Sequence, residues 1–203
     1  MTAHHPRSMR LGRIAWGSVL VGAALAVGRW SSTREGREVD RELFGELNRG
    51  HGQDVDRVFF GVTELGSLWA AGAAASALAL AGRRRAAASA FGAAGVTWLV
   101  GQALKRAIER PRPYEADADA TRLLIGPPAA SSWPSSHPAV LAAWTGVAAR
   151  ELGLSGAPRA ALTGLALAVA ASRVYVGVHY PSDVTSGFLL GRAVAAVWPA
   201  GRS

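Results

Sequence analysis

Six hydrophobic runs constrain the fold of this chain more than any other feature of its sequence. Each run has close to the roughly 17 to 25 residues that a helix needs to cross a bilayer, with the last three at the short end. Glycine and alanine are abundant in the runs, and in lipid such small residues allow helices to pack closely. The sequence therefore predicts an all-α bundle of six transmembrane helices, at Ile14–Trp30, Val58–Gly82, Ala86–Leu104, Pro138–Leu154, Ala160–Val178 and Val184–Trp198.

Composition narrows the class of protein. Half of the residues are hydrophobic and only 18% are charged, which leaves too little polar surface for a soluble helical bundle. The net charge of +8 does not indicate nucleic-acid binding, because the basic residues lie in short clusters between apolar runs. The absence of cysteine excludes disulfides and thiolate metal sites. We expect one membrane domain over residues 1–203, whose motifs lie within about 104–198.

The arginine distribution predicts how the bundle is oriented. Uncompensated arginines collect in segments that share one side if there are six helices, and that side should be cytoplasmic. The opposite, outer side then receives Ser31–Arg57, Lys105–His137 and the Arg173–Asp183 turn. The arginines that set this orientation are Arg7, Arg10, Arg13, Arg83, Arg84, Arg85, Arg150, Arg159 and Arg202.

Two segments between the runs carry weaker patterns. Ser31–Arg57 places Val39, Leu43, Phe44 and Leu47 at helical spacing, which fits a short helix lying at the membrane interface or an ordinary solvated helix. Ala116–Ala130 is rich in aspartate, glycine and proline and is predicted to be an irregular loop. Aromatic residues near the predicted interfaces are expected to form belts there: Tyr175, Tyr180, Trp30, Trp133 and Trp198.

Three short motifs place charged residues at the edges of the apolar runs. Lys105 is followed after six residues by Arg112-Pro113; next comes Pro134-Ser135-Ser136-His137; last comes Ser172-Arg173, then His179 and Asp183. Charged groups there are costly unless they pair or bind a ligand. Together the three motifs predict a phosphate site.

Each residue type in these motifs suits one task in phosphoryl transfer. Fixed cations stabilise the phosphoryl oxygens, and Lys105, Arg112 and Arg173 supply them. Ser135 offers a hydroxyl, while the amides near Ser136 and His137 lie at an expected helix start that favours an anion. His179 and Asp183 are separated by four positions across a predicted turn, so the carboxylate can orient the imidazole as a nucleophile.

In this order the motifs resemble those of the type 2 phosphatidic acid phosphatase (PAP2) superfamily, which also includes the vanadium haloperoxidases. The resemblance covers about Leu104 to Trp198, with Ser136 standing where the family usually has glycine. It implies that His179 attacks phosphorus to form a phosphohistidine while His137 protonates the leaving group. It also implies magnesium independence, and no metal site or cofactor is expected. Non-motif Arg106 and Arg110 are expected to face headgroups or loop carboxylates.

The leading hypothesis is a membrane phosphatase that acts on a lipid phosphate or diphosphate at the outer face of the cell membrane. Phosphatidic acid, phosphatidylglycerol phosphate and polyprenyl mono- or diphosphates all remain candidate substrates. The alternative is an anionic-lipid binding or transport protein without catalysis, which would have no need for His137 together with the His179–Asp183 pair. A haloperoxidase is disfavoured because those enzymes are expected to be larger and soluble.

Overall fold

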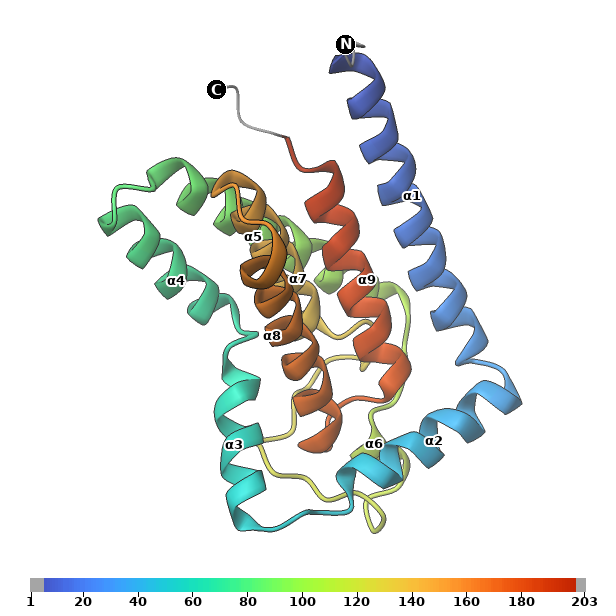
Figure 1. Cartoon of the computed structure of the whole chain (residues 1–203). Helices are drawn as coiled ribbons and strands as arrows, with labels where there is room; N and C mark the ends of the chain where they lie inside the picture. The colour runs from blue at the N-terminus through green and yellow to red at the C-terminus, as the bar shows by residue number, and fades with distance from the viewer. Residues whose placement is uncertain (1–5, 200–203) are drawn as a thin grey trace.

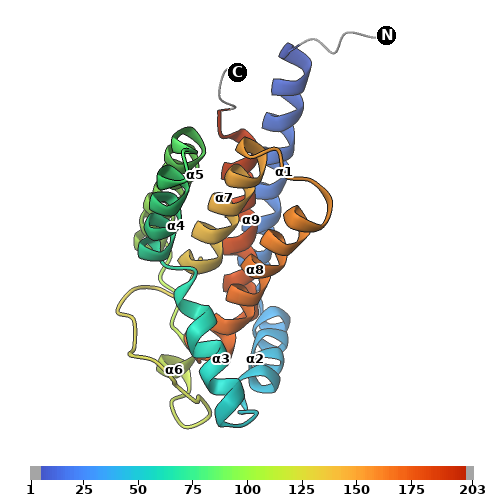
Figure 2. The ribbon, with the colours of Figure 1, turned by 60° about the vertical axis from the view of Figure 1, so that its left-hand side comes forward.

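The computed structural model describes residues 6–199, and within that range the chain forms nine helices and no strands. Six of them make up the bundle (Figure 1). The three other helices gather at one end of it, together with the long loop that follows α5 (Figures 1 and 2). The bundle helices are α1 (Pro6–Trp30), α4 (Leu68–Leu80), α5 (Arg84–Ala107), α7 (Ser136–Glu151), α8 (Gly156–Tyr175) and α9 (Pro181–Val197). The helices at its end are α2 (Arg34–Asn48), α3 (Gln53–Glu64) and α6 (Pro113–Ala116).

Helix α7 is the centre of the bundle. Every residue from Pro138 to Ala149 is buried, and α5, α8 and α9 pack around it. Glycines on α9 permit the closest approach: a Cβ at Gly187 would lie 2.2 Å from the Ser135 carbonyl oxygen, and one at Gly191 would lie 2.1 Å from that of Ala139. Small residues therefore bring the middle of α9 against the start of α7. The Ser135 amide also donates to the Asp183 carbonyl at 3.0 Å, so the two helix starts, which carry motif residues, lie together.

The predicted second helix is not a single helix. Val58–Gly82 falls on two helices, α3 and α4, which meet at a bend of 67°. The chain turns at Leu65–Gly66, and Ser67 then caps α4 by accepting a hydrogen bond from the Ala70 amide at 3.0 Å. A Cβ at Gly66 would lie 2.7 Å from His137 Cβ, so the break sets the chain closely against the second motif.

By length and hydropathy, fewer of the described helices can cross a membrane than the six predicted. Among the described residues, α1 and α5 are long and apolar enough to cross a bilayer, and the bent pair α3 and α4 would make a third span. Helices α7, α8 and α9 have 16, 20 and 17 residues and do not meet the same test. The all-α bundle is confirmed within the described residues, whereas six crossings stay a prediction.

Helix α2 confirms the predicted helix within Ser31–Arg57, but it buries a different face. Asp40, Phe44 and Asn48 are buried against the bundle, while Leu43 is 49% exposed. The expected irregular loop over Ala116–Ala130 is present after α6. The aromatic-belt expectation is wrong for Tyr175, Tyr180 and Trp133, because all three are buried in the protein. Local spacing did not reveal that polar residues anchor α2.

The two ends of the bundle differ in charge and chemistry. Helix α1 begins, α9 ends, and the α4–α5 and α7–α8 connections turn at one end, which therefore carries most of the predicted orienting arginines (Figures 1 and 2). The motif residues lie towards the other end, among α2, α3, α6 and the long loop. Arg202 and the side chain of Arg7 lie outside the described residues. Which end faces the cytoplasm stays a prediction.

Candidate active site

Proline residues start two of the helices that shape the site. Pro113 and Pro181 both occupy the first turn, where a missing amide proton breaks no hydrogen bond. The preceding residues are then fixed by acidic side chains: Glu115 accepts the Arg112 amide at 2.7 Å, and Asp183 accepts the Tyr180 amide at 2.9 Å. The Arg-Pro and His-Tyr-Pro segments of the motifs thus have a local structural reason for their sequence.

His179 and Asp183 come together as predicted across this turn. Asp183 is fully buried, and its Oδ2 lies 3.6 Å from Nδ1 of His179, longer than a hydrogen bond but close enough for electrostatic attraction. The other ring nitrogen, Nε2, lies 3.4 Å from a terminal nitrogen of Arg112. The imidazole therefore presents one nitrogen to a carboxylate and the other to a cation.

The electrostatics keep the His179 imidazole uncharged. Burial lowers the pKa of His179 well below its ordinary value, and the positive charges of Lys105, Arg112 and Arg173 lower it further. A neutral imidazole retains a lone pair on one nitrogen at neutral pH. Because Asp183 lies beside Nδ1 and favours a proton there, the lone pair is directed to Nε2, on the side of the cations.

The three predicted phosphate-binding cations are buried and lack acidic partners. The Lys105 ammonium donates to the Ser131 carbonyl at 2.5 Å. Arg112 donates to the carbonyls of Ala130 at 2.7 Å and Val178 at 2.8 Å. No carboxylate forms an ion pair with Lys105, Arg112 or Arg173 anywhere in residues 6–199. Backbone carbonyls orient these charges without neutralising them, which leaves a cluster suited to an anion.

Arg173 is held by a contact that the sequence did not indicate. One terminal nitrogen donates to the Thr63 hydroxyl at 2.8 Å, and its Nε has no partner within the described chain. Thr63 is fully buried near the end of α3, just before the break that precedes α4. The end of α3 thus positions the Arg173 guanidinium, whose Nε remains free to bind a ligand.

The second motif supplies hydrogen-bond donors at the start of α7. Ser135 is the residue before the helix, and the hydroxyls of Ser135 and Ser136 are buried without a partner in the described residues. His137 is the second residue of the helix and is an electrostatic neighbour of all three cations. A helix start with free donors beside a cation cluster favours a bound anion. The structure thus gathers all eight predicted site residues in one region.

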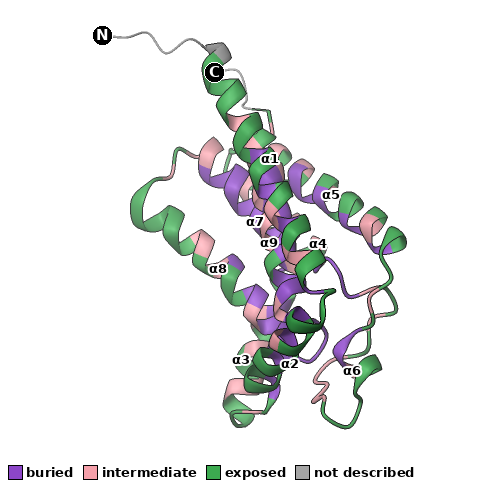
Figure 3. Cartoon of the chain, turned by 90° about the vertical axis from the view of Figure 1, so that its right-hand side faces the viewer, coloured by how far each residue is buried: buried purple, intermediate pink, exposed green. Residues whose placement is uncertain are grey.

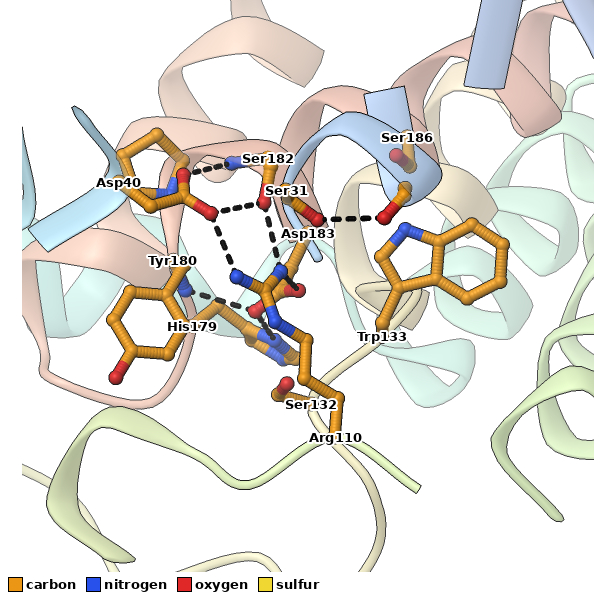
Figure 4. Close-up of polar contacts among 12 residues, drawn as sticks. Ser31, Asp40, Arg110, Ser132, Trp133, His179, Tyr180, Ser182, Asp183 and Ser186 are labelled. Carbon is orange, nitrogen blue, oxygen red and sulfur yellow. Dashed lines mark hydrogen bonds and ion pairs between the residues drawn. The ribbon is translucent and has the colours of Figure 1, made fainter. Parts of the chain in front are cut away.

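A second charged network supports Asp183, and the sequence patterns missed it (Figure 4). Arg110 ion-pairs with Oδ1 of Asp183 and donates to the Ser182 hydroxyl at 2.7 Å. Its other terminal nitrogen lies 2.7 Å from Oδ2 of Asp40, on α2. Asp40 in turn accepts the Ser182 amide at 2.9 Å. Nearby Asp183 and Asp40 raise the pKa of Arg110 although burial opposes the charge, so this guanidinium stays protonated.

The two non-motif arginines, Arg106 and Arg110, therefore lie in different surroundings. Arg110 meets carboxylates, as expected, but one of them is the buried motif carboxylate Asp183. Arg106 is exposed. No local spacing could have shown the partnership between Arg110 and Asp40, which are 70 positions apart.

Two apolar cavities reach the second motif from between the bundle helices. One, of about 910 Å³, lies between α4 and α5 and is lined by Trp69, Phe91 and Trp98, with Ser136 and His137 at its inner wall. The other, of about 500 Å³, lies among α1, α5, α7 and α9 and reaches Ser135 and Ser136. Apolar cavities that end at polar groups can hold the tail of an amphipathic ligand.

A metal site is not apparent in the part of the chain that the structure describes. No three histidine, aspartate or glutamate side chains come together there as ligands. The positive charge at the site is supplied by Lys105, Arg112 and Arg173.

Comparisons with known proteins agree with this geometry. The family model of the PAP2 superfamily matches residues 85–202. A decaprenylphosphoryl-5-phosphoribose phosphatase of Mycobacterium tuberculosis is 36% identical over 135 residues, which cover 64% of this chain and 68% of the relative. The Mycolicibacterium smegmatis protein of the same name is 34% identical over 119 residues, or 59% of this chain and 62% of the relative.

Solved structures resemble the fold over most of its length. A transmembrane PAP2-type phosphatidylglycerolphosphate phosphatase from Bacillus subtilis aligns with a TM-score of 0.70 at 23% identity, covering 88% of this chain and 91% of that one. LpxE from Aquifex aeolicus aligns with a TM-score of 0.69 at 26% identity, covering 76% and 90%. Both likenesses extend beyond the motif region to the helices that precede it.

Proposed function

Because the chain belongs to the PAP2 superfamily, we propose that it is a membrane phosphatase that removes a phosphate group from a lipid at the cluster of Lys105, Arg112 and Arg173. The observation that carries this proposal is the burial of three cations that have no acidic partner within residues 6–199, next to a neutral imidazole that lies beside Asp183. A protein that only bound lipid headgroups would have no need for the imidazole and its carboxylate. Hydrolysis uses both.

The first step transfers the phosphoryl group to His179. Lys105, Arg112 and Arg173 hold the non-bridging oxygens, with the donors of Ser135 and Ser136. Nε2 of His179 attacks phosphorus, a P–N bond forms, and the bond from phosphorus to the leaving oxygen breaks. His137 gives its proton to that oxygen. Burial and the positive charges of Arg173, Lys105 and Arg112 lower the pKa of His137 to about 3 in the free site. A bound phosphate dianion offsets these charges and raises that pKa, which favours the protonated imidazole that this step requires.

The second step returns the enzyme to its starting state. His137, now neutral, takes a proton from water, and the resulting hydroxide attacks the phosphohistidine. The P–N bond breaks, inorganic phosphate forms, and His179 recovers its lone pair. Asp183 stabilises positive charge on the imidazole while the phosphoryl group is attached.

We further propose that Arg110 positions Asp183. Arg110 bonds to Oδ1 of Asp183, while Oδ2 of the same carboxylate accepts the Tyr180 amide and faces His179. Asp40 forms an ion pair with the other terminal nitrogen of Arg110. It also accepts the Ser182 amide, which connects α2 to the start of α9. Arg110 acts through Asp183 and is not assigned a contact with substrate.

The substrate class follows from the cavities and the relatives. The apolar cavity that ends at Ser136 and His137 suits a long hydrocarbon tail whose phosphate lies among the cations. The relatives are named for a decaprenyl-linked phosphoribose, in which a phosphate is carried on a sugar joined to a polyprenyl chain. We therefore propose a polyprenyl-linked phosphate monoester as the substrate, hydrolysed at the outer face of the plasma membrane.

Phosphate release from a lipid panel tests this proposal. Purified protein in detergent should release phosphate from polyprenyl-linked phosphoribose faster than from phosphatidic acid or phosphatidylglycerol phosphate. Lys105→Gln should remove this activity, whereas Arg106→Gln, a matched change at the exposed neighbouring residue, should retain it. Equal activity in the two variants would contradict the assignment of the cation cluster. A preference for glycerolipids would contradict the substrate assignment alone.

A further inference from the structure

A cavity lined by four arginines lies at the end of the bundle opposite the motif residues. It has a volume of about 450 Å³ and is formed by α1, α7, α8 and α9. This size falls within the range of about 300–1,000 Å³ that is usual for small-ligand sites. None of its lining residues is acidic. The basic lining residues are Arg13, Arg150, Arg159 and Arg192, and the others include Met9, Trp16, Ala195 and Ala196.

Two of these arginines have a role in folding. Arg13 donates to the Ala196 carbonyl at 2.8 Å, and Arg150 donates to the Ala195 carbonyl at 2.7 Å. These are carbonyls of the last turn of α9, which have no partner within the helix and lie at the negative end of its dipole. Arg13 and Arg150 therefore cap α9, and their positions are fixed.

The other two arginines have no such role. The guanidinium groups of Arg159 and Arg192 make neither a hydrogen bond nor an ion pair with the part of the chain that the structure describes. Arg192 nevertheless lies across α7 at Gly146, where an added Cβ would be 3.2 Å from one of its terminal nitrogens. Arg192 and Arg159 line the same cavity, so two like charges share one space.

Orientation in the membrane does not require this convergence. Arginines that favour the cytoplasmic side act from exposed loops and need no common cavity. Here four guanidinium groups surround one space. Within the described residues the one ion pair that any of them forms joins Arg150 to Glu151 at 3.9 Å, and Glu151 also lies 3.6 Å from Arg85. One carboxylate shared with Arg85 leaves a large excess of positive charge around the cavity, and such an excess favours a bound anion.

We propose that this cavity binds the phosphate headgroup of an anionic phospholipid from the leaflet at that end of the bundle. Helix α1, which supplies one wall, is exposed along most of its length, and only 11% of its most apolar stretch is buried (Figure 3). Met9 and Trp16 on that wall are 60% and 57% exposed. A lipid tail can lie along this apolar face while its phosphate enters the cavity, an arrangement open to an anionic lipid and not to free phosphate. The site is separate from the hydrolytic one.

Thermal unfolding in lipid nanodiscs tests the proposal. Wild-type protein should unfold at a higher temperature in discs containing phosphatidylglycerol than in discs of phosphatidylcholine alone, by roughly 2–4 °C or more. The double variant Arg159→Gln/Arg192→Gln, which breaks no contact in the described structure, should lose most of this difference. Arg83→Gln, an exposed arginine at the same end but outside the cavity, should retain it.

A second arm separates lipid from soluble anion and from the hydrolytic site. Inorganic phosphate added to phosphatidylcholine discs should not reproduce the shift, and Arg173→Gln should keep the lipid shift. A full shift with inorganic phosphate would overturn the lipid assignment. An unchanged shift in the double variant, or its loss in Arg173→Gln alone, would overturn the assignment to this cavity.

Discussion

The Arg110 network offers a sharp test of how the site is held together. Arg110 joins Asp40 and Asp183, two carboxylates that are buried and would otherwise lack a cation. Arg110→Ala removes that cation, and breaking a buried ion pair in this way costs about 3–5 kcal/mol. Such a loss could unfold the bundle, so this variant alone would not separate positioning from folding.

Arg110→Lys is the more informative change. Lysine keeps the charge but has no fork, so it can engage only one of the two carboxylates well. The loss of one charge-assisted hydrogen bond is worth about 1.5–3 kcal/mol. If Asp183 is the carboxylate that loses its bond, the activation free energy rises by the same amount, and kcat falls roughly 10- to 150-fold.

Steady-state phosphate release with a soluble short-chain substrate measures this effect. Arg110→Lys should lower kcat and leave KM near the wild-type value, because Arg110 is not placed against the phosphate. Arg106→Lys is the matched control and should change neither constant. The reasoning would be refuted by an Arg110→Lys protein with normal kcat, or by one whose KM rises while kcat is unchanged.

Three further predictions concern the same site. In steady-state assays, Ser136→Gly should change kcat by no more than about tenfold, or about 1.4 kcal/mol. The reason is that the Ser136 hydroxyl has no partner in the described residues and lies beside Gly101. An inactive wild type that glycine rescues would contradict this prediction. Because the pKa of His179 lies below its ordinary value, the nucleophile stays unprotonated as pH falls through about 6.5, so kcat/KM should show no acid limb from His179 near that pH. Activity should survive EDTA and be inhibited by orthovanadate, since fixed cations hold the phosphate; loss in EDTA that magnesium restores would oppose this mechanism.

The sequence predicted which residues gather at the site better than it predicted which residues support them. The motif residues were identifiable because short spacings in this family specify a chemical task, and Pro113 and Pro181 fix those spacings at helix starts. The partner of Arg110 was not identifiable, because Asp40 lies on a different helix and hydrophobic periodicity in α2 drew attention to Leu43 and Leu47 instead.

The break between α3 and α4 shows the same limit. Gly66 and Ser67 are a plausible turn and helix cap, but within a long apolar run the prediction of a continuous span outweighed them. The reason for the break is tertiary. Gly66 packs against His137, and Thr63 bonds to Arg173, so the bend connects two of the motifs. Contacts of this kind depend on packing between distant segments, which local patterns do not report.

The central claim is that His179 carries the phosphoryl group during turnover. Acid quenching of the enzyme during hydrolysis would lose a phosphohistidine, which is acid-labile, so the reaction should be stopped in alkali and the peptide containing His179 examined by mass spectrometry. We predict a phosphate adduct on His179 in the wild type and no adduct in His179→Ala. With a substrate that has a good leaving group, His137→Ala should slow only the second step and therefore give a larger adduct signal. An adduct on another residue, or full turnover by His179→Ala protein, would contradict the mechanism.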